Sequence, residues 1–239
     1  MLYLISDIHG QYNDFRKILK KIAFDRGKDR LIILGDILDR GPEGIRLLEY
    51  IKPYLMDHSM ELLLGNHELF AMMYMKGDLE ERTWISFGGG DTVKSIKQMM
   101  AAEQKALLHF LESLPCYLEI DSEFLGAVIL THTGIDCDNY VMNPNGTINI
   151  KKSIEKAFQN NRYNFMVGMD LHDVPISDKK KFDSYLIVGH VPCCRLNDDE
   201  SNRFYRTKYY MDIDAGAGHK DYGGVLGCYC VTTDKEIYL

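Results

Sequence analysis

The chain has 239 residues, of which 46% are hydrophobic and 26% are charged, and its formal net charge is −7 at pH 7. This apolar fraction excludes a disordered chain, and the length allows one domain to bury a core without disulfide or metal staples. The acidic balance argues against a nucleic-acid partner, which calls for clustered positive charge. A small anionic substrate stays compatible with it, because local cations or bound metal ions can reverse the sign of one cleft.

The sequence shows no signal for a membrane or for a disulfide framework. Its apolar runs, such as residues 31–34 and 127–130, are far shorter than the roughly 20 residues that span a bilayer. The start has no basic flank and leads directly into Ser6 and Asp7, so no signal peptide is expected. The six cysteines form no C-x-x-C pair. We therefore expect a cytoplasmic protein with reduced cysteines and no membrane partner.

The first third repeats one pattern, in which an apolar strand is followed by a polar loop and then by a helix. The strands are predicted at residues 1–6, 30–34 and 60–64, and the helices begin near residues 13, 43 and 68. Alternation of this kind is typical of βαβ units whose parallel strands are buried on both faces.

The remainder of the chain reads differently. A charged helical excursion is predicted at about 76–115, a strand pair at 116–130 that turns near Asp121, and a helix at 150–160. Short strands are predicted at 185–188, 204–214, 224–232 and 236–239. Because no linker or repeat interrupts the chain, we expect a single domain over residues 1–239.

Polar residues gather where the predicted strands end. In open α/β sheets, ligands bind beyond the carboxyl ends of the strands. Turn chemistry would explain one such end, but five of them supply imidazole, carboxylate and amide groups, which are ligands suited to Mn, Fe or Zn. Two such metals about 4 Å apart would clamp an in-line displacement at phosphorus. The five ends are Asp7-x-His9-Gly10, Gly35-Asp36-x-x-Asp39-Arg40-Gly41, Gly65-Asn66-His67-Glu68, His132-Thr133-Gly134 and Gly189-His190.

These blocks, in this order, resemble those of the calcineurin-like metallophosphoesterases. Within them they resemble the PPP-type serine/threonine protein phosphatases of the compact bacterial kind, like that of bacteriophage lambda. Residues 213–217 resemble the terminal Asp-Thr-Gly-Ala segment of that family, and Trp84, Gly88-Gly89 and Thr92 resemble a segment of its bacterial members. The resemblance implies an α/β fold, a four-layer αββα sandwich of two mixed β-sheets flanked by helices.

The resemblance also implies six ligands for two divalent metal ions. Mn is expected to serve most readily in vitro, with Fe and Zn as alternatives. A hydroxide bridging the two ions would attack phosphorus directly, with no phosphoenzyme. The ligands divide into Asp7, His9 and His190 on one ion, Asn66 and His132 on the other, and Asp36 as the bridge.

Three further residues receive catalytic roles from the resemblance. His67 is the expected general acid, Asp39 would hydrogen-bond its imidazole, and Arg40 would grip the phosphate oxygens. Asn66 and His67 would also contact the substrate. Two family features are missing, because Leu64 replaces a frequent arginine and no Trp-x-Arg element is found. Arg162 or Arg195 could supply the lost phosphate contact.

The expected function is hydrolysis of phosphoserine and phosphothreonine in proteins, with phosphotyrosine as a further substrate. Two alternatives stay open, a dinucleoside polyphosphate hydrolase on the same scaffold and a non-catalytic binding module. Asp39 favours the phosphatase, since symmetrical tetraphosphatases often replace it, and the complete set of site positions argues against the binding module. The other histidines are predicted to be surface or core residues, and they are His58, His109, His172 and His219.

Overall fold

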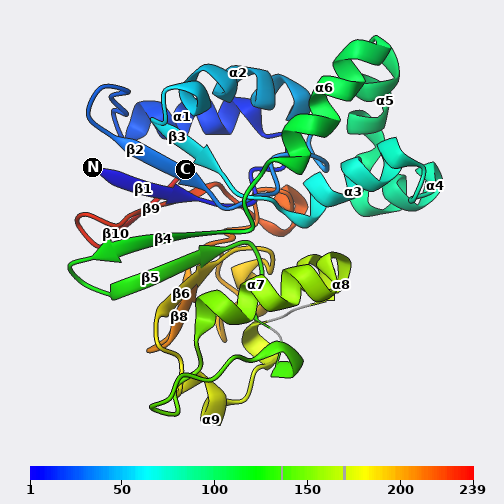
Figure 1. Cartoon of the computed structure of the whole chain (residues 1–239). Helices are drawn as coiled ribbons and strands as arrows, with labels where there is room; N and C mark the ends of the chain where they lie inside the picture. The colour runs from blue at the N-terminus through cyan, green and yellow to red at the C-terminus, as the bar shows by residue number, and fades with distance from the viewer. Residues whose placement is uncertain (136, 169–170) are drawn as a thin grey trace.

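The computed structural model describes residues 1–135, 137–168 and 171–239. Figure 1 shows two β-sheets stacked face to face, with helices on their outer sides. The strand order is β10-β9-β1-β2-β3 in the first sheet and β4-β5-β6-β8-β7 in the second. Both sheets mix parallel and antiparallel pairs. The predicted sandwich of two mixed sheets flanked by helices is confirmed.

The first sheet joins the two ends of the chain. Strands β1 (Leu2–Ile5), β2 (Arg30–Ile33) and β3 (Met60–Leu62) pair in parallel, as the repeated strand–helix pattern predicts. Strands β9 (Gly227–Cys230) and β10 (Lys235–Tyr238) add to it in antiparallel fashion. The parallel strands therefore end at one edge of this sheet, and the loops that follow them meet there.

The second sheet begins with the hairpin of β4 (Tyr117–Ser122) and β5 (Gly126–Thr131), whose turn lies at residues 123–125, slightly later than predicted. Strands β5, β6 (Tyr185–Val188) and β8 (Tyr210–Asp212) run parallel, and β7 (Tyr205–Arg206) closes the edge.

The strand expected at 204–214 is broken into β7 and β8. The Thr207 hydroxyl accepts the backbone N–H groups of Tyr209 and Tyr210 at 3.2 and 3.1 Å, which forms a turn between the two strands. A threonine hydroxyl competes with the sheet for backbone donors in this way, and alternation of apolar residues does not reveal it.

The outer layers are helical. Helices α1 (Tyr12–Lys21) and α2 (Gly44–Met56) cover the first sheet, while α7 (Ile150–Asn160) and α8 (Arg162–Gly168) lie along the second sheet (Figure 1). Helix α7 occupies the predicted residues. It buries Ile150, Ile154 and Ala157 on one face, and its cap Asn149 accepts the N–H of Lys152 at 2.9 Å.

A further group of helices projects from one end of the sheets, at the right of Figure 1. Helix α3 (Asn66–Lys76) starts directly after β3 and leads into this group. The others are α4 (Glu81–Trp84), the π-helical η1 (Ile85–Gly89), α5 (Gly90–Gln98) and α6 (Ala101–Glu112). Short helices elsewhere are η2 (Cys137–Asn139), η3 (Leu171–Asp173), α9 (Ile176–Lys179), η4 (Cys193–Arg195) and η5 (Lys220–Tyr222).

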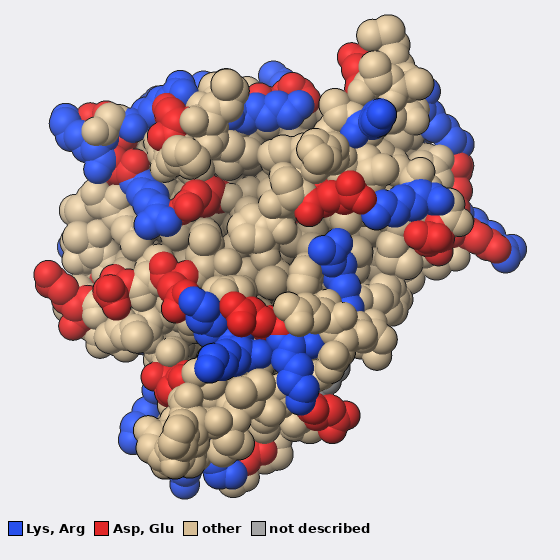
Figure 2. All heavy atoms as spheres, in the orientation of Figure 1, with Lys and Arg blue, Asp and Glu red and all other residues tan. Residues whose placement is uncertain are grey.

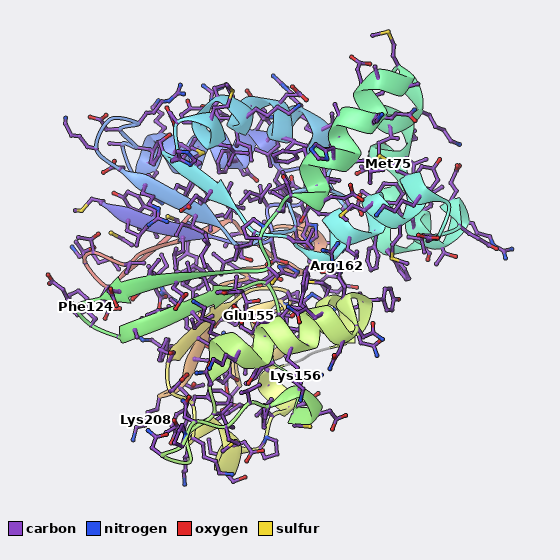
Figure 3. All side chains as sticks on the ribbon, viewed as in Figure 1. Met75, Phe124, Glu155, Lys156, Arg162 and Lys208 are labelled. Atoms are coloured by element: carbon purple, nitrogen blue, oxygen red, sulfur yellow. The ribbon has the colours of Figure 1, made fainter. Side chains whose placement is uncertain are left out.

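Apolar side chains fill the space between the sheets (Figure 3). Leu4 and Ile32 come from the first sheet and pack in one cluster with Leu130, Ile187 and Met211 from the second, all fully buried. This core fixes one sheet against the other, so the loops at their carboxyl ends keep a constant separation. Among the described residues, no helix is both long and apolar enough to cross a bilayer.

We expect Ile187→Val to lower the free energy of unfolding by about 1 kcal/mol, because it removes one methylene from this packed layer. Urea denaturation followed by circular dichroism measures the change. The matched control is Ile176→Val in α9, where the side chain is 59% exposed, and it should change stability by less than about 0.5 kcal/mol. Equal effects of the two variants would contradict the assignment of Ile187 to the core.

Candidate metal centre and active site

The loops that carry the site turn through left-handed backbone. Ten non-glycine residues in the described part of the chain have positive φ, and six of them belong to the predicted site: Asp7, His9, Asp36, Asp39, Arg40 and His190, with φ between 47° and 78°. Each such residue costs on the order of 1–3 kcal/mol and persists only where the surrounding structure holds it. The strain is therefore concentrated where the strand-end side chains are turned toward a common point.

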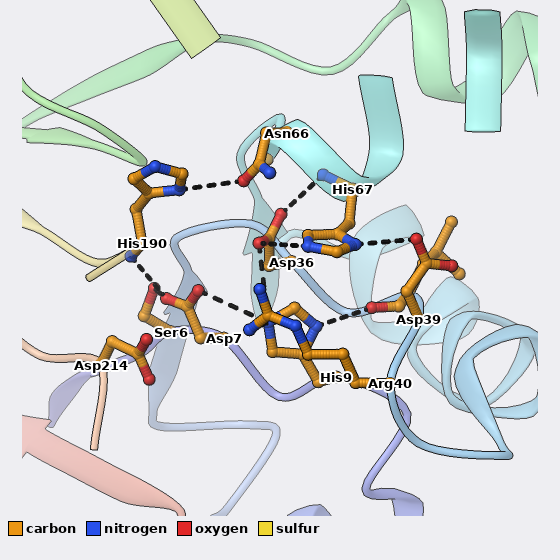
Figure 4. Close-up of polar contacts among 12 residues, drawn as sticks. Ser6, Asp7, His9, Asp36, Asp39, Arg40, Asn66, His67, His190 and Asp214 are labelled. Atoms are coloured by element: carbon orange, nitrogen blue, oxygen red, sulfur yellow. Dashed lines mark hydrogen bonds and ion pairs between the residues drawn. The ribbon is translucent and has the colours of Figure 1, made fainter. Parts of the chain in front are cut away.

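The Asp36 carboxylate lies at the centre of this group of side chains (Figure 4). Its Oδ2 lies 3.7 Å from His9 Nε2, 3.8 Å from His67 Nε2 and 3.4 Å from His132 Nε2. Its Oδ1 accepts the backbone N–H of His67 at 2.9 Å. Asp36 is also buried, with 1% of its surface exposed. Its position among three imidazole groups is the one expected of a bridging ligand.

Backbone carbonyls set the tautomers of two histidines. Nδ1 of His9 donates to the Leu38 carbonyl at 2.9 Å, and Nδ1 of His132 donates to the Leu34 carbonyl at 2.8 Å. Each Nε2 therefore directs a lone pair into the cluster, which is how histidine ligands are commonly oriented. The Arg40 guanidinium donates to the His9 lone pair at 2.7 Å, which shows that this lone pair is directed at a cationic group.

Asn66, His132 and His190 form a second group of ligand atoms. The Asn66 Oδ1 lies 2.8 Å from His132 Nε2 and 3.0 Å from His190 Nδ1. The expected division placed His190 with Asp7 and His9, whereas the imidazole of His190 lies beside Asn66, so the division of ligands between two ions stays a prediction. Asp7 Oδ2 instead accepts the backbone N–H of His190 at 3.0 Å, and the left-handed backbone of His190 turns its imidazole toward Asn66.

These residues fit divalent metal ions. Oδ1 of Asp7 is buried and has no hydrogen-bond partner in the described part of the chain, a costly state for a carboxylate unless a cation faces it. Its other oxygen accepts the hydroxyl of Ser6. The ligand atoms form two groups, and within each group all atoms lie within 4.8 Å of one another: one group comes from His9, Asp36 and His67, the other from Asp36, His132 and His190. Oxygen and imidazole donors of this kind suit Mn, Fe and Zn.

The cluster shifts the pKa values of its members in opposite directions. Burial opposes the ionisation of Asp36, but the neighbouring His132 and His67 outweigh it and hold the Asp36 pKa well below its usual range. Burial likewise opposes the charging of His132, but Asp36 raises the His132 pKa to about 10. Burial, together with the charge of His132, lowers the His190 pKa to about 3, so His190 is a neutral donor at pH 7.

Glu68 connects two of the site loops, a role that the sequence interpretation did not assign. Its Oε2 accepts the N–H groups of Asp36 and Gly65 at 2.7 and 3.0 Å, and its Oε1 accepts those of Ile37 and Leu38 at 3.0 and 3.1 Å. Burial, reinforced by the charge of Asp36, raises the Glu68 pKa to about 7. A side chain at residue 65 would lie 2.2 Å from Asp36 Oδ1, so the loop requires glycine there.

His67 and Asp39 form the predicted pair. Nδ1 of His67 lies 2.7 Å from Asp39 Oδ2. Two residues of the projecting helices hold the same carboxylate, since Trp84 Nε1 donates to Oδ2 at 2.6 Å and the Thr92 hydroxyl donates to Oδ1 at 2.5 Å. All four side chains are buried. The sequence analysis marked Trp84 and Thr92 only as family features, and the structure shows that they position Asp39.

Of the three arginines considered for phosphate contacts, Arg40 and Arg162 lie in different places. Arg40 borders the cluster through its contact with His9. Arg162 belongs to α8, where its guanidinium stacks 4.4 Å from the ring centroid of Phe158 (Figure 3). No described contact joins Arg162 to the cluster, and its binding role stays a prediction. Leu64, at the position of the missing family arginine, is a buried core residue.

The sequence matches the calcineurin-like phosphoesterase family over residues 2–211. The chain therefore belongs to the calcineurin-like phosphoesterases, and its predicted place in this superfamily is confirmed. Membership also implies divalent metal ions, in agreement with the donor groups described above.

Several curated relatives are symmetrical bis(5'-nucleosyl)-tetraphosphatases. The protein of Buchnera aphidicola is 32% identical over 134 residues, which is 56% of this chain and 44% of that protein. The protein of Klebsiella pneumoniae is 32% identical over 133 residues, again 56% of this chain and 43% of that protein. The matched region thus spans less than half the length of these relatives.

Solved structures share the fold at lower identity. One assigned as a diadenosine tetraphosphatase has a TM-score of 0.60 and 15% identity, and the match covers 100% of this chain and 92% of that one. A protein serine/threonine phosphatase of Saccharomyces cerevisiae has a TM-score of 0.63 and 17% identity, with coverage of 100% and 78%. These likenesses show the architecture alone.

The names of the curated relatives contradict the expected phosphoprotein phosphatase and agree with the alternative, a dinucleoside polyphosphate hydrolase. The expected protein substrate is likewise unsupported. Asp39, which favoured the phosphatase, is a poor guide because its buried carboxylate is engaged by His67, Trp84 and Thr92. It therefore reports on the acid and not on the substrate class.

We expect Glu68→Gln to weaken Mn²⁺ binding roughly ten- to a hundredfold, because an amide group turns two of the four accepting contacts into donor–donor contacts and releases the loop of Asp36. Calorimetric titration with Mn²⁺ measures this. Glu81→Gln is the matched control, since Glu81 pairs with Lys97 at a half-exposed position. A folded Glu68→Gln protein with unchanged Mn²⁺ affinity would contradict the role of Glu68.

Proposed function

We propose that this chain hydrolyses dinucleoside polyphosphates and cleaves a tetraphosphate symmetrically into two nucleoside diphosphates. The observation that carries the proposal is the likeness to symmetrical tetraphosphatases over 133 and 134 residues. The site supports it, since the strand-end residues gather metal-ligand atoms beside an arginine and a histidine–carboxylate pair.

We propose two divalent ions for the site, with Mn as the most suitable in vitro and Fe or Zn as alternatives. One group of ligand atoms centres on His9 and Asp36, the other on Asn66, His132 and His190, and Asp36 is common to both. When bound, the ions would lower the pKa of a water molecule and polarise the phosphoryl oxygens.

The residues of the chain would bind and orient the phosphoanhydride. The fork of Arg40 presents parallel N–H groups to phosphoryl oxygens. As the oxygen of water bonds to phosphorus, the bond from phosphorus to the bridging oxygen breaks and its electron pair leaves with one nucleoside diphosphate. His67 can supply a proton to that oxygen from Nε2, because Asp39 accepts the hydrogen bond from Nδ1.

With Mn²⁺, we expect the protein to convert diadenosine tetraphosphate to ADP alone, because attack at either inner phosphorus that breaks the central bridge gives two identical products. Anion-exchange chromatography of the reaction distinguishes ADP from the pair ATP and AMP. Removal of metal with EDTA should abolish turnover, and added Mn²⁺ should restore it. Hydrolysis of p-nitrophenyl phosphate or a phosphopeptide without any turnover of diadenosine tetraphosphate would overturn the proposal.

We expect His67→Asn to lower kcat by roughly 10²–10⁴-fold while the protein keeps its metal, since the variant loses proton transfer but no proposed ligand. Turnover and metal content are measured on the same preparation. His67 Nε2 also lies in the ligand group of His9 and Asp36, so the result separates two roles. A variant that loses one metal equivalent would show that His67 is a ligand instead of the acid.

A further inference from the structure

A cleft of about 490 Å³ opens beside the proposed metal centre. Most of its lining residues have no role in the proposed hydrolysis. Arg40 and His190 form its inner end, next to the reacting groups. The rest of its lining includes Arg195, His172, Asp173 and His219. A volume of this size lies in the range of roughly 300–1,000 Å³ typical of small-molecule sites.

Two loops build the cleft after strands of the second sheet. The short helix η4 carries Arg195, and the N–H of Cys193 in that helix donates to the Asp214 carbonyl at 2.8 Å. The chain after Asp214 then passes directly over the metal centre. A side chain at Gly218 would lie 2.5 Å from His9 Cδ2 and 2.9 Å from Arg40 Cδ. This close approach places His219 at the cleft, and it explains why glycine occupies position 218.

The two arginines of the cleft differ from most others in the chain. In the described part of the structure, neither Arg40 nor Arg195 has a carboxylate within 4.0 Å. Of the other eight arginines, five pair with carboxylates, while Arg16, Arg162 and Arg203 lie over aromatic rings. Figure 2 shows blue and red side chains side by side over much of one face. The paired arginines are Arg26, Arg30, Arg46, Arg82 and Arg206. The lining also contains one carboxylate, that of Asp173, which pairs with neither arginine. Two guanidinium groups in one cleft without carboxylate partners favour an anionic ligand.

Two histidines complete the lining, although the sequence analysis expected them to be ordinary surface or core residues. Burial, together with the charges of Arg40 and Arg195, lowers the His219 pKa to about 4, so this imidazole is neutral at pH 7. The imidazole of His172 is fixed by Asp212 Oδ2 at 3.1 Å and the Tyr210 hydroxyl at 2.7 Å. Neutral or fixed imidazole rings suit a nucleoside better than a phosphate.

We propose that this cleft binds one nucleoside diphosphate half of the substrate, with Arg195 on the phosphate farther from the metal centre and His219 beside the nucleoside. The inference rests on the proposed function and extends it, because it assigns the residues that would recognise more than a single phosphoryl group. The lining supports it: Arg40 contacts His9 and His190 contacts Asn66 at the metal centre, and Arg195 and His219 line the same cleft.

The test uses inhibition of p-nitrophenyl phosphate hydrolysis by the Mn²⁺-loaded protein, so it does not depend on turnover of a dinucleotide. We expect Arg195→Ala to weaken inhibition by ADP about tenfold, the loss of one charge-assisted contact. Inhibition by inorganic phosphate and the KM for p-nitrophenyl phosphate should stay within about twofold. Arg82→Ala is the control, since Arg82 is 87% exposed and pairs with Glu80.

Unchanged inhibition by ADP in Arg195→Ala would overturn the inference. So would an equal weakening of ADP and phosphate, because Arg195 would then act on the metal centre itself. A wild-type protein that leaves diadenosine tetraphosphate intact but is inhibited by ADP through Arg195 would refute the proposed function and keep the cleft as a nucleotide site. Arg195→Lys, which retains charge without the planar fork, should give an intermediate inhibition constant.

Discussion

The buried carboxylate of Asp36 is the constraint on which the site depends. Its Oδ2 lies within 4 Å of three imidazole Nε2 atoms that arrive from separate loops. A charge so deeply buried is tolerated only with compensating partners, and the same partners make the point attractive to metal cations. Glu68 holds the loop of Asp36 through four backbone N–H groups. The ligand geometry is thus set by hydrogen bonds one layer behind it.

The projecting helices support the proposed acid, His67, rather than the proposed metal ligands. Trp84 and Thr92 each donate to Asp39, and Asp39 in turn fixes His67. Through these contacts the segment between β3 and β4 orients the imidazole of His67, which its charged, helical composition does not suggest. Gly88, with φ of 103°, lets the backbone pass close to Arg40, and the Arg40 N–H donates to its carbonyl at 2.9 Å. The segment between β3 and β4 therefore positions both His67, the proposed acid, and Arg40, the proposed phosphate-binding arginine.

Chemistry and substrate class are carried by different parts of this molecule. The metal cluster and the pair of His67 and Asp39 can serve a phosphomonoester or a phosphoanhydride, because both reactions displace a group from phosphorus. Discrimination must come from what surrounds the cluster. In the structure that surrounding is the cleft of Arg195 and His219, which is assembled from loops after β6 and β8. The sequence analysis relied on Asp39 for the substrate class, and that carboxylate is buried against His67, Trp84 and Thr92.

The sequence by itself determined the strand–helix repeat, the polar strand ends and the chemical types of the ligands, because alternating polarity and glycine-bounded polar blocks are local signals. It also placed α7 and β6 at their observed residues. Only the tertiary structure decided that His190 joins Asn66, that Glu68 holds the Asp36 loop, and that residues after Asp214 reach the metal centre. These are contacts between segments far apart in the chain. They follow from the packing of two sheets, which no local pattern encodes.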